Sequence, residues 1–402
     1  MRVLLTIVVL CFAGISLAQQ CQNPPTAFVP ITDLGLNTFN GWTGGLYGNG
    51  SNEIPQAHQS VGIQIASTIL PRNASGGLDA NGKIGFISMG MSNANMFFST
   101  FREQSIAFPQ FNPRVTMVNG ATGGKDIDNL LDPNDSYWTS VDQKMAAAQL
   151  TNAQVQVIWF EQAKHISGIP PNEGINHIAI MEQKFLQAFQ YFKQRYPNLR
   201  QIFCSGRDYG GYSNPGLGNP EPYAYYTNWA FRKLMERQLN GDPALHFGNP
   251  QTPTAWLAWS GHLWANGAQP RNDGFQWLCL QDVMDDGVHP SPAGRAKIAA
   301  ILLQFFSTSP VTPWYRQQPL NVSNLSMASW HLVPNPAHDV IEVLPPQPSA
   351  FRYRILALTG QVISTGNTNQ ILVSSLPQGV YFMEITPVGE STFVKRFVVG
   401  RN

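Results

Sequence analysis

The chain of 402 residues has little charge. Lys and Arg number 25 and Asp and Glu number 24, so that charged residues make up only 12% of the sequence. Basic runs and arginine clusters are missing, which argues against nucleic acid or an anionic membrane as a partner. Asn, Gln, Gly, Pro and Ser are plentiful instead. This balance is common in exported proteins.

Long apolar runs are also scarce, and the clearest one stands at the start of the chain. Arg2 precedes an apolar core over residues 3–13, which is too short to span a bilayer comfortably. Ser16-Leu17-Ala18 follows with the small-x-small pattern of a cleavage site. We therefore predict a signal peptide over residues 1–18 and no transmembrane segment after its removal.

Cysteine is rare as well, with four residues in the whole chain. Beyond the predicted signal peptide remain Cys21, Cys204 and Cys279, an odd number that allows one disulfide and one buried thiol. Their spacing suits neither a disulfide framework nor a metal site. A phosphate-binding loop is absent, and the late aspartates match no cation-binding loop: Asp273, Asp282, Asp285 and Asp286. We therefore expect no cofactor and no metal.

The length of the chain and its changes of composition predict two domains. With 43% hydrophobic residues the chain can bury a full core, and 402 residues exceed one average domain. Residues 307–329 carry three prolines and little periodicity, which is typical of a linker. We predict a main domain over 19–306 and a second domain over 330–402. Residues 22–82, rich in Gly, Asn, Pro and Gln, are expected to wrap the main domain.

Short apolar segments alternate with helical patterns along the main domain. The predicted strands cover residues 84–89, 114–118, 155–160, 200–204 and 256–259. The predicted helices cover residues 92–104, 181–196 and 223–239, and a last one that starts at Ser291 or the neighbouring prolines and continues through 298–305. This alternation predicts an α/β fold, with a parallel sheet and helices on both faces. Loops at the carboxyl ends of its strands then meet at one edge, where ligands bind.

Two of these loops carry a nucleophile and a base. Ser92 follows Gly90 at the end of the first strand, a setting that suits an activated nucleophile. His289 lies on the loop that enters the last helix, and Asp286, three residues upstream, can orient its ring. Asp285 is an adjacent alternative to Asp286. The pattern indicates acyl transfer, in which His289 takes the proton of Ser92.

Two stretches resemble the SGNH/GDSL hydrolase superfamily of esterases. Gly90-Met91-Ser92 is similar to its first block, and Asp286-Gly287-Val288-His289-Pro290 to its last, within a span of roughly residues 75–308. The resemblance implies a flavodoxin-like three-layer domain with Ser92, Asp286 and His289 as catalytic residues. The chain departs from the family at Met91, where the family has Asp.

The resemblance also implies an oxyanion hole and neighbouring substrate contacts. Its donors are the backbone N–H groups of Ser92 and of a glycine after the second strand, for which Gly124 matches best and Gly123 next. The usual G-x-N-D block is missing after the third strand, and Gln162 is an amide at a similar distance. After the fourth strand, Arg207 and Tyr209 are candidate substrate contacts, with loop packing as an equal alternative.

The tail of the chain consists of short alternating runs separated by turns. Such runs predict a small β-sandwich over residues 330–402, with strands at 340–344, 353–358, 361–365, 371–373, 380–385 and 393–399.

This tail resembles the C-terminal sorting domain of the type IX secretion system in the Bacteroidetes. The match is carried by Pro334-Asn335-Pro336-Ala337, Leu358-Thr359-Gly360-Gln361, Leu376-Pro377-Gln378-Gly379-Val380-Tyr381 and Lys395-Arg396-Phe397-Val398-Val399. It implies contact with the secretion machinery, passage through the outer membrane, and release or attachment at the cell surface. A carbohydrate-binding accessory domain is the alternative.

Together these patterns predict a secreted serine esterase that removes acetyl or other acyl groups from a carbohydrate. The carbohydrate is inferred from the export route, since exported proteins of such bacteria often process glycans. The alternative is a non-catalytic glycan-binding or cell-surface protein on the same fold.

Overall fold

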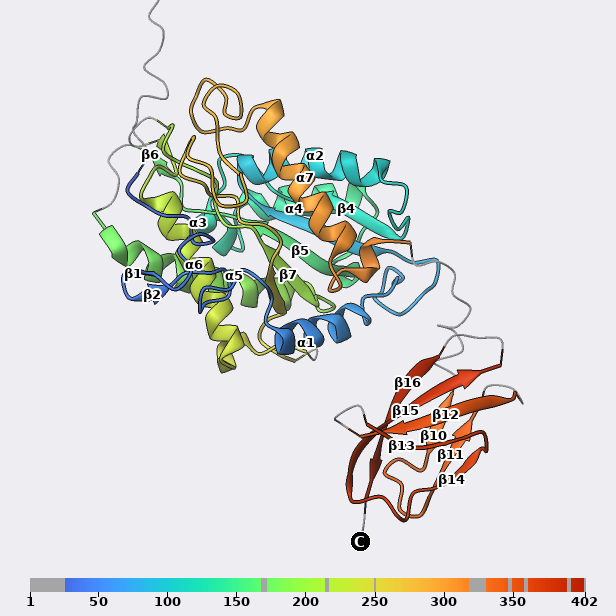
Figure 1. The fold of residues 1–402 in the computed structure, drawn as a ribbon. Helices are drawn as coiled ribbons and strands as arrows, with labels where there is room; N and C mark the ends of the chain where they lie inside the picture. The colour runs from blue at the N-terminus through green and yellow to red at the C-terminus, as the bar shows by residue number, and fades with distance from the viewer. Residues whose placement is uncertain are drawn as a thin grey trace, which may run out of the picture. The chain divides into compact units, whose positions relative to one another are not determined.

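The computed structural model describes residues 26–167, 172–213, 217–248, 251–317, 330–345, 349–357, 361–388 and 392–400. The chain divides into two compact units, Met1–Gln317 and Gln318–Asn402 (Figure 1). The predicted signal peptide and residues 318–329 of the predicted linker lie outside the described residues. Among the helices of the described residues, none is long and apolar enough to cross a membrane.

The first unit is built on a five-stranded parallel sheet, with its strands in the spatial order β4-β3-β5-β7-β9. Their bounds are β3 (Ile84–Gly90), β4 (Val115–Asn119), β5 (Val155–Glu161), β7 (Gln201–Cys204) and β9 (Trp256–Trp259). By position in the chain, this order is second, first, third, fourth, fifth, which is the flavodoxin-like arrangement. The predicted α/β fold class is therefore confirmed. The order reverses between β3 and β5, and open α/β sheets form their ligand crevice at such a switch point.

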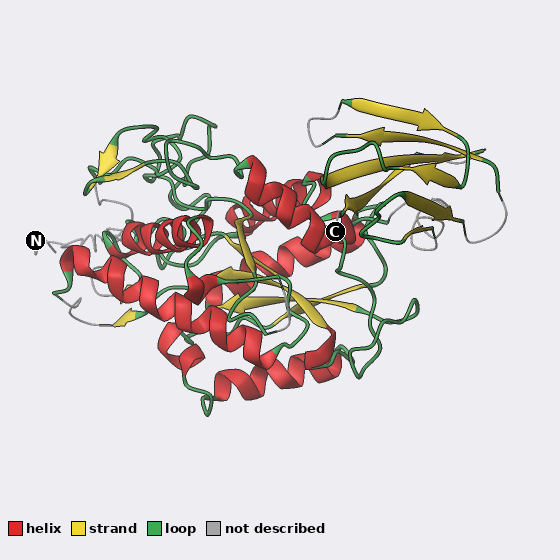
Figure 2. Ribbon diagram, turned by 90° about the horizontal axis from the view of Figure 1, so that it is seen from below, coloured by secondary structure: helices red, strands yellow, loops and turns green. Residues whose placement is uncertain are grey.

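Helices cover both faces of this sheet (Figure 2). One face carries α2 (Ser92–Ala107) and α7 (Pro292–Thr308), and the other carries α4 (Ser136–Ala147), α5 (His177–Arg195) and α6 (Tyr223–Leu239). On the first face, the ring of Phe86 lies 5.4 Å from Phe98 and 5.0 Å from Phe306. On the second face, the ring of Phe160 lies 5.5 Å from Phe185. Successive strand residues point to opposite faces, so the apolar strands fill two separate layers of core.

Several elements of the first unit were not predicted from the sequence. They are α1 (Gln56–Ala66), α3 (Ile127–Leu131), α4, and the two-residue strand pairs β1 (Thr38–Phe39) with β2 (Trp42–Thr43) and β6 (Ile166–Ser167) with β8 (Leu217–Gly218). Capping side chains begin two of the helices: Asp135 accepts from the Tyr137 N–H at 2.7 Å, and Asp126 accepts from the Asp128 N–H at 2.9 Å. N-cap hydrogen bonds of this kind stabilise the start of a helix even where the pattern of apolar residues does not reveal the helix.

The segment before β3 covers the edge strand β9. An edge strand leaves N–H and C=O groups unpaired, and here side chains bind them. The Tyr47 hydroxyl accepts from the Trp259 N–H at 2.9 Å, and His58 Nε2 donates to the Leu257 carbonyl at 2.8 Å. Tyr47 is thus a packing residue, and the Gly-rich segment closes one edge of the sheet.

The first unit continues to pack beyond residue 306, where the sequence predicted its end. The Trp314 Nε1–H donates to Gln201 at 2.8 Å, and the Tyr315 hydroxyl donates to Ser105 at 2.7 Å. Pro313 begins a turn of 3₁₀ helix that buries both aromatic side chains. The prolines of this stretch, interpreted as linker residues, instead direct residues 309–317 onto the body of the unit.

The second unit consists of two antiparallel sheets. One has the order β10-β11-β14 and the other β13-β12-β15-β16. Their bounds are β10 (His331–Val333), β11 (Val340–Leu344), β12 (Phe351–Leu356), β13 (Val362–Gly366), β14 (Gln370–Leu372), β15 (Gly379–Pro387) and β16 (Phe393–Val399). Side chains of both sheets, among them Ile341 and Met383, share one buried core. The predicted all-β sandwich is therefore confirmed, although residues 358–360 of one quoted turn lie outside the described residues.

The cysteines fall into two classes. Cys204, at the end of β7, is a free and fully buried thiol. Cys279 is disulfide-bonded, and its partner lies outside the described residues, as does Cys21. One disulfide and one buried thiol is the arrangement that the odd cysteine number allowed.

We expect Tyr47→Phe to lower the free energy of unfolding by about 1–3 kcal/mol, because the buried Trp259 N–H then has no acceptor. Urea denaturation measures this loss. Tyr191→Phe is the control, since the Tyr191 hydroxyl makes no hydrogen bond within the described residues, and it should stay within about 0.5 kcal/mol of the parent. An equal response of the two variants would contradict the capping role.

Candidate active site

Ser92 is the first residue of α2, and a single residue separates it from the end of β3. β3 ends at Gly90, where an added Cβ would lie 2.0 Å from the Glu161 carbonyl oxygen and 2.4 Å from the Ala94 Cβ. Only glycine therefore allows the chain to pass so close to β5 before it turns into the helix. Met91 stands at the N-cap and provides no side-chain hydrogen bond. The sharp turn thus places Ser92 at the switch point of the sheet.

His289 and Asp286 line up with this serine. His289 Nε2 lies 2.9 Å from Ser92 Oγ, and His289 Nδ1 lies 2.5 Å from Asp286 Oδ2. The three predicted residues therefore form one chain of contacts at hydrogen-bond distances. Asp285, the adjacent alternative, is exposed and makes no side-chain contact of this kind among the described residues.

The three-residue spacing of Asp286 and His289 produces this alignment through a tight turn. Asp286 Oδ1 accepts from the N–H groups of Val288 and His289, both at 2.9 Å. Gly287 has a φ of +68°, and an added Cβ there would lie 2.1 Å from the Tyr212 carbonyl oxygen. The turn therefore requires glycine at its second position.

The environment of Asp286 favours its ionised form. Burial raises its pKa, but the hydrogen bonds from His289 and Val288 outweigh this effect and hold the pKa below its ordinary value. A carboxylate at this place keeps the ring proton of His289 on Nδ1. The lone pair of Nε2 then faces Ser92, which is the arrangement that a general base needs.

The loop after β4 brings a glycine close to Ser92. An added Cβ at Gly123 would lie 3.8 Å from the Ser92 Cβ, whereas no heavy atom lies within 4 Å of one added at Gly124. Gly123, the second choice from the sequence, is thus the glycine next to the serine. The N–H groups of Gly123 and Gly124 make no backbone hydrogen bond within the described residues.

Gln162 lies directly after β5 and is fully buried. Its Nε2 donates to the Lys125 carbonyl at 3.2 Å, and its Oε1 accepts from the Ala163 N–H at 2.9 Å. The side chain therefore fastens the loop of Gly123 to the end of β5. One N–H of the amide is used in this contact, and the amide carries a second.

Arg207 and Tyr209 are only 4% and 5% exposed. Arg207 Nη1 lies 3.0 Å from Glu161 Oε1 and 3.0 Å from Asp208 Oδ1. Two carboxylates thus compensate the charge of the buried guanidinium. The burial of both side chains favours the packing alternative over their prediction as substrate contacts.

The sequence did not reveal the polar cluster around this arginine. Burial raises the pKa of Glu161 and that of Asp208, and Arg207 partly offsets the increase. Asn93, the residue after Ser92, donates from Nδ2 to Asp208 Oδ2 at 2.8 Å. The sequence contained one signal of this cluster, namely Glu161, a charged residue at the end of a buried strand.

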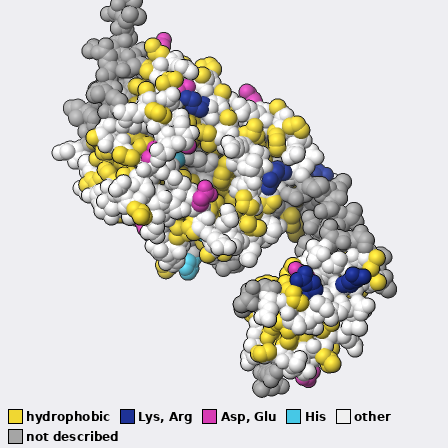
Figure 3. All heavy atoms as spheres, viewed as in Figure 1, with side chains coloured by type: hydrophobic (Ala, Val, Ile, Leu, Met, Phe, Trp, Pro, Cys, Tyr) yellow, Lys and Arg dark blue, Asp and Glu magenta, His cyan; other side chains and the backbone are white. Residues whose placement is uncertain are grey.

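The surface carries little charge, as the composition requires. In the view of Figure 3, white and yellow atoms prevail and charged side chains are scattered. Within the described residues, no three His, Cys, Asp or Glu side chains gather in a way that could hold a metal ion.

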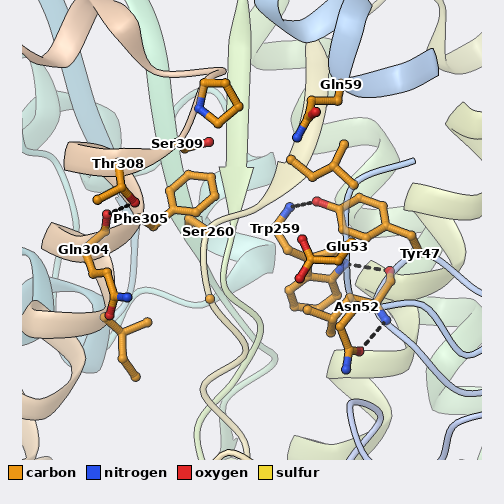
Figure 4. Close-up of a pocket in the computed structure, with 15 residues that line it drawn as sticks. Tyr47, Asn52, Glu53, Gln59, Trp259, Ser260, Gln304, Phe305, Thr308 and Ser309 are labelled. Atoms are coloured by element: carbon orange, nitrogen blue, oxygen red, sulfur yellow. Dashed lines mark hydrogen bonds between the residues drawn. The ribbon is translucent and has the colours of Figure 1, made fainter. Parts of the chain in front are cut away.

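A hollow of about 450 Å³ lies apart from Ser92. It is bounded by the segment over residues 46–59, by the end of β9 and by the second half of α7, and none of the predicted site residues lines it. Figure 4 shows its two walls, with Gln304, Phe305 and Thr308 on one side and Tyr47, Asn52 and Gln59 on the other. Volume alone therefore does not locate the candidate site.

Comparison with known proteins identifies the tail. A family model described as the secretion system C-terminal sorting domain matches residues 331–400. The chain therefore carries a type IX sorting domain, as predicted, and the protein is exported to the cell surface or released. A solved structure of a DUF3244 family protein from Bacteroides vulgatus, with an immunoglobulin-like β-sandwich fold, is 15% identical, covers 18% of this chain and 91% of its own, and has a TM-score of 0.15. No curated protein matches the chain at a significant level.

We expect Arg207→Leu to lower the free energy of unfolding by about 3–5 kcal/mol at pH 8, since it leaves two buried carboxylates without their cation. The loss should be smaller at pH 5. Without the arginine, the folded-state pKa values of Glu161 and Asp208 rise further above their unfolded values, so stability present at low pH is lost as the pH rises. Urea denaturation at both pH values measures the difference.

Arg237→Leu is the matched control for this variant. Arg237 also binds two carboxylates, those of Glu182 and Asp242, but its side chain is 31% exposed. Its removal should cost less than about 1 kcal/mol, with little dependence on pH in this range. Similar losses for the two arginine variants would show that the buried cluster has no special role in stability.

Proposed function

We propose that the first unit is a serine esterase with Ser92 as its nucleophile. The observation that supports this best is the alignment of Asp286, His289 and Ser92, with contacts of 2.5 Å and 2.9 Å. A base within hydrogen-bond reach of a hydroxyl, itself oriented by a carboxylate, is the arrangement that activates a serine.

The reaction proceeds in two balanced steps. His289 Nε2 takes the proton of Ser92 Oγ while Oγ bonds to the ester carbonyl carbon, and the imidazolium then protonates the leaving alcohol as the acyl–oxygen bond breaks. Water attacks the resulting acyl-serine in the same way and gives its proton to His289. Ser92 regains that proton as the carboxylic acid leaves, which restores the starting state.

The N-terminus of α2 stabilises the oxyanion in this proposal. The Ser92 N–H is the first of a 16-residue helix, whose dipole favours negative charge at this end. The Gly123 N–H is its partner, supported by the proximity of Gly123 to Ser92, with Gly124 as the neighbouring alternative. The second N–H of Gln162 supplies a side-chain donor where the usual Asn is missing.

We propose an acylated carbohydrate as the substrate. The sorting domain supports this choice, because an exported enzyme meets extracellular polymers. A low density of charge also suits a neutral polymer better than an ionic one.

The second candidate is a non-catalytic glycan-binding or cell-surface protein. It is favoured by Met91, where the resembled family has Asp, and by the missing G-x-N-D block. The tight turn that aligns Asp286 and His289 with Ser92 argues for the esterase, since a binding module has no need of it.

Hydrolysis of p-nitrophenyl acetate by the purified mature protein tests the esterase. Ser92→Ala and His289→Ala should lower kcat by about 10⁴-fold or more, to background, because each removes a member of one catalytic unit. Asp286→Asn should lower it less. Asp285→Asn, which changes the neighbouring exposed carboxylate, should leave kcat at the parent value.

Circular dichroism and thermal unfolding confirm that each of these variants is folded. Background turnover of the parent protein towards acetylated xylan and p-nitrophenyl acetate alike would reject the esterase. Glycan binding by the parent and by Ser92→Ala would then support the second candidate.

We expect Gln162→Ala to lower kcat by about 10²-fold, the usual effect of removing one oxyanion donor. Gln154→Ala is the matched control. Gln154 is a buried amide just before the start of β5, and it donates to the Arg72 carbonyl at 2.7 Å. It therefore lies at the amino end of the strand, whereas Gln162 lies at its carboxyl end. Parent-like kcat in Gln162→Ala would remove the amide from the proposed oxyanion hole.

A further inference from the structure

The side chain of Asn93 joins three segments that are distant in sequence. Asn93 follows Ser92 on α2 and is fully buried. Its Nδ2 donates to Asp208 Oδ2 at 2.8 Å and to the Val288 carbonyl at 2.9 Å. Both protons of the amide are therefore used, one on the loop after β7 and one on the histidine loop.

The contact with Val288 restrains the peptide unit that carries the histidine. The Val288 carbonyl and the His289 N–H belong to the same planar peptide group. Asn93 binds its carbonyl oxygen, and Asp286 Oδ1 binds its N–H at 2.9 Å. The peptide is thus held from both ends, which limits the rotations that would move the His289 ring away from Ser92.

The contact with Asp208 anchors Asn93 to the sheet. Asp208 lies against Arg207, and Arg207 Nη1 lies 3.0 Å from Glu161 at the end of β5. All three residues are at most 5% exposed. An unpaired polar group is costly in such an interior, so the cluster favours the arrangement in which these contacts are made. This arrangement holds the Asn93 side chain in place, and Asn93 in turn holds the histidine loop.

The donors of Asn93, and not its carbonyl, make these contacts. Asn93 Oδ1 is buried and has no hydrogen-bond partner within the described residues. Aspartate has nearly the same shape but, when ionised, cannot donate to the Asp208 carboxylate or the Val288 carbonyl. The role is therefore open to a test at constant side-chain size.

We infer that Asn93 is a positioning residue of the site, which sets the distance between His289 and Ser92 by clamping the peptide unit of Val288 and His289. This inference rests on the proposed esterase function. Asn93 itself contacts neither the serine hydroxyl nor the imidazole through any hydrogen bond among the described residues.

The first test compares Asn93→Ala with the parent full-length mature protein. We expect kcat for p-nitrophenyl acetate to fall by about 10- to 100-fold with KM nearly unchanged, because misplacement of a base affects the chemical step. The second-order rate of Ser92 modification by a fluorophosphonate should fall in parallel. Parent-like kcat and modification rate in Asn93→Ala would overturn the inference and leave the esterase proposal intact.

Asn112→Ala is the matched control for lost stability. Asn112 lies just before the amino end of β4, whereas Ser92 follows the carboxyl end of β3. Asn112 Nδ2 donates to the Trp314 carbonyl at 2.9 Å. Its removal should lower Tm while kcat and the modification rate stay at the parent values. A drop in kcat as large as that of Asn93→Ala would show that any destabilised variant loses activity, and would overturn the positioning role.

Asn93→Asp supplies a second variant and a pH-dependent readout. The carboxylate that it introduces repels Asp208 when ionised, whereas in the protonated form it can again donate a hydrogen bond. The ratio of the kcat of Asn93→Asp to that of Asn93→Ala should therefore rise between pH 8 and pH 6, and the ratio cancels any pH dependence that the two variants share. If Asn93→Ala does not fold, Asn93→Ser takes its place in this ratio. A ratio that does not change with pH would overturn the inference.

The parent protein alone distinguishes failure of the inference from failure of the proposed function. A parent protein that neither hydrolyses esters nor reacts with the fluorophosphonate overturns the proposed function, and the inference with it. An active parent protein with a parent-like Asn93→Ala variant overturns the inference alone.

Discussion

The close approach of β3 and β5 at Gly90 is the constraint on which the first unit depends. The two strands pair in parallel up to Gly90 and Glu161, and no side chain fits between the Gly90 Cα and the Glu161 carbonyl. The chain must leave the sheet there in a sharp turn, which makes Ser92 the first residue of a helix. Gln162 and the loop of Gly123 are held at the same edge because β4 and β5 both flank β3.

Buried polar groups near this edge contact one another at a distance from the reacting atoms. Glu161, Arg207 and Asp208 exchange contacts inside the protein, and Asn93 extends them to the turn of Asp286 and His289. Such a cluster contributes little net stability for its cost of burial. We interpret it as a cluster that favours one conformation of two loops. Export is a property of the β-sandwich, whose core is built from residues between Trp330 and Val399.

The sequence predicted the parts of this arrangement that depend on local pattern. The five central strands are short, mainly apolar segments, and Asp286 and His289 stand at the two ends of a four-residue turn. Within the described residues of the tail, six of the seven strands were predicted, because alternating runs bounded by turn residues mark most of them, while the three-residue β10 was missed. α3 and α4 were missed because their apolar periodicity is weak and their N-cap side chains contribute to their stability instead. The end of the first unit was placed too early because the burial of Trp314 and Tyr315 depends on tertiary contacts. The sequence ranked Gly124 before Gly123 as a backbone donor, and it could not place either glycine, since a one-residue difference in a loop depends on the conformation of the loop. The contact of Asn93 with Asp208 joins residues 115 positions apart, and no local pattern encodes it.

The central claim is that His289 activates Ser92 as a nucleophile. The most direct measurement is peptide mass mapping after exposure of the mature protein to a fluorophosphonate, which bonds covalently to activated serines. The account predicts one adduct per chain, on Ser92, in the parent protein, and none at the same exposure in His289→Ala. An adduct on another residue, or an equal yield of Ser92 adduct with and without His289, would contradict it.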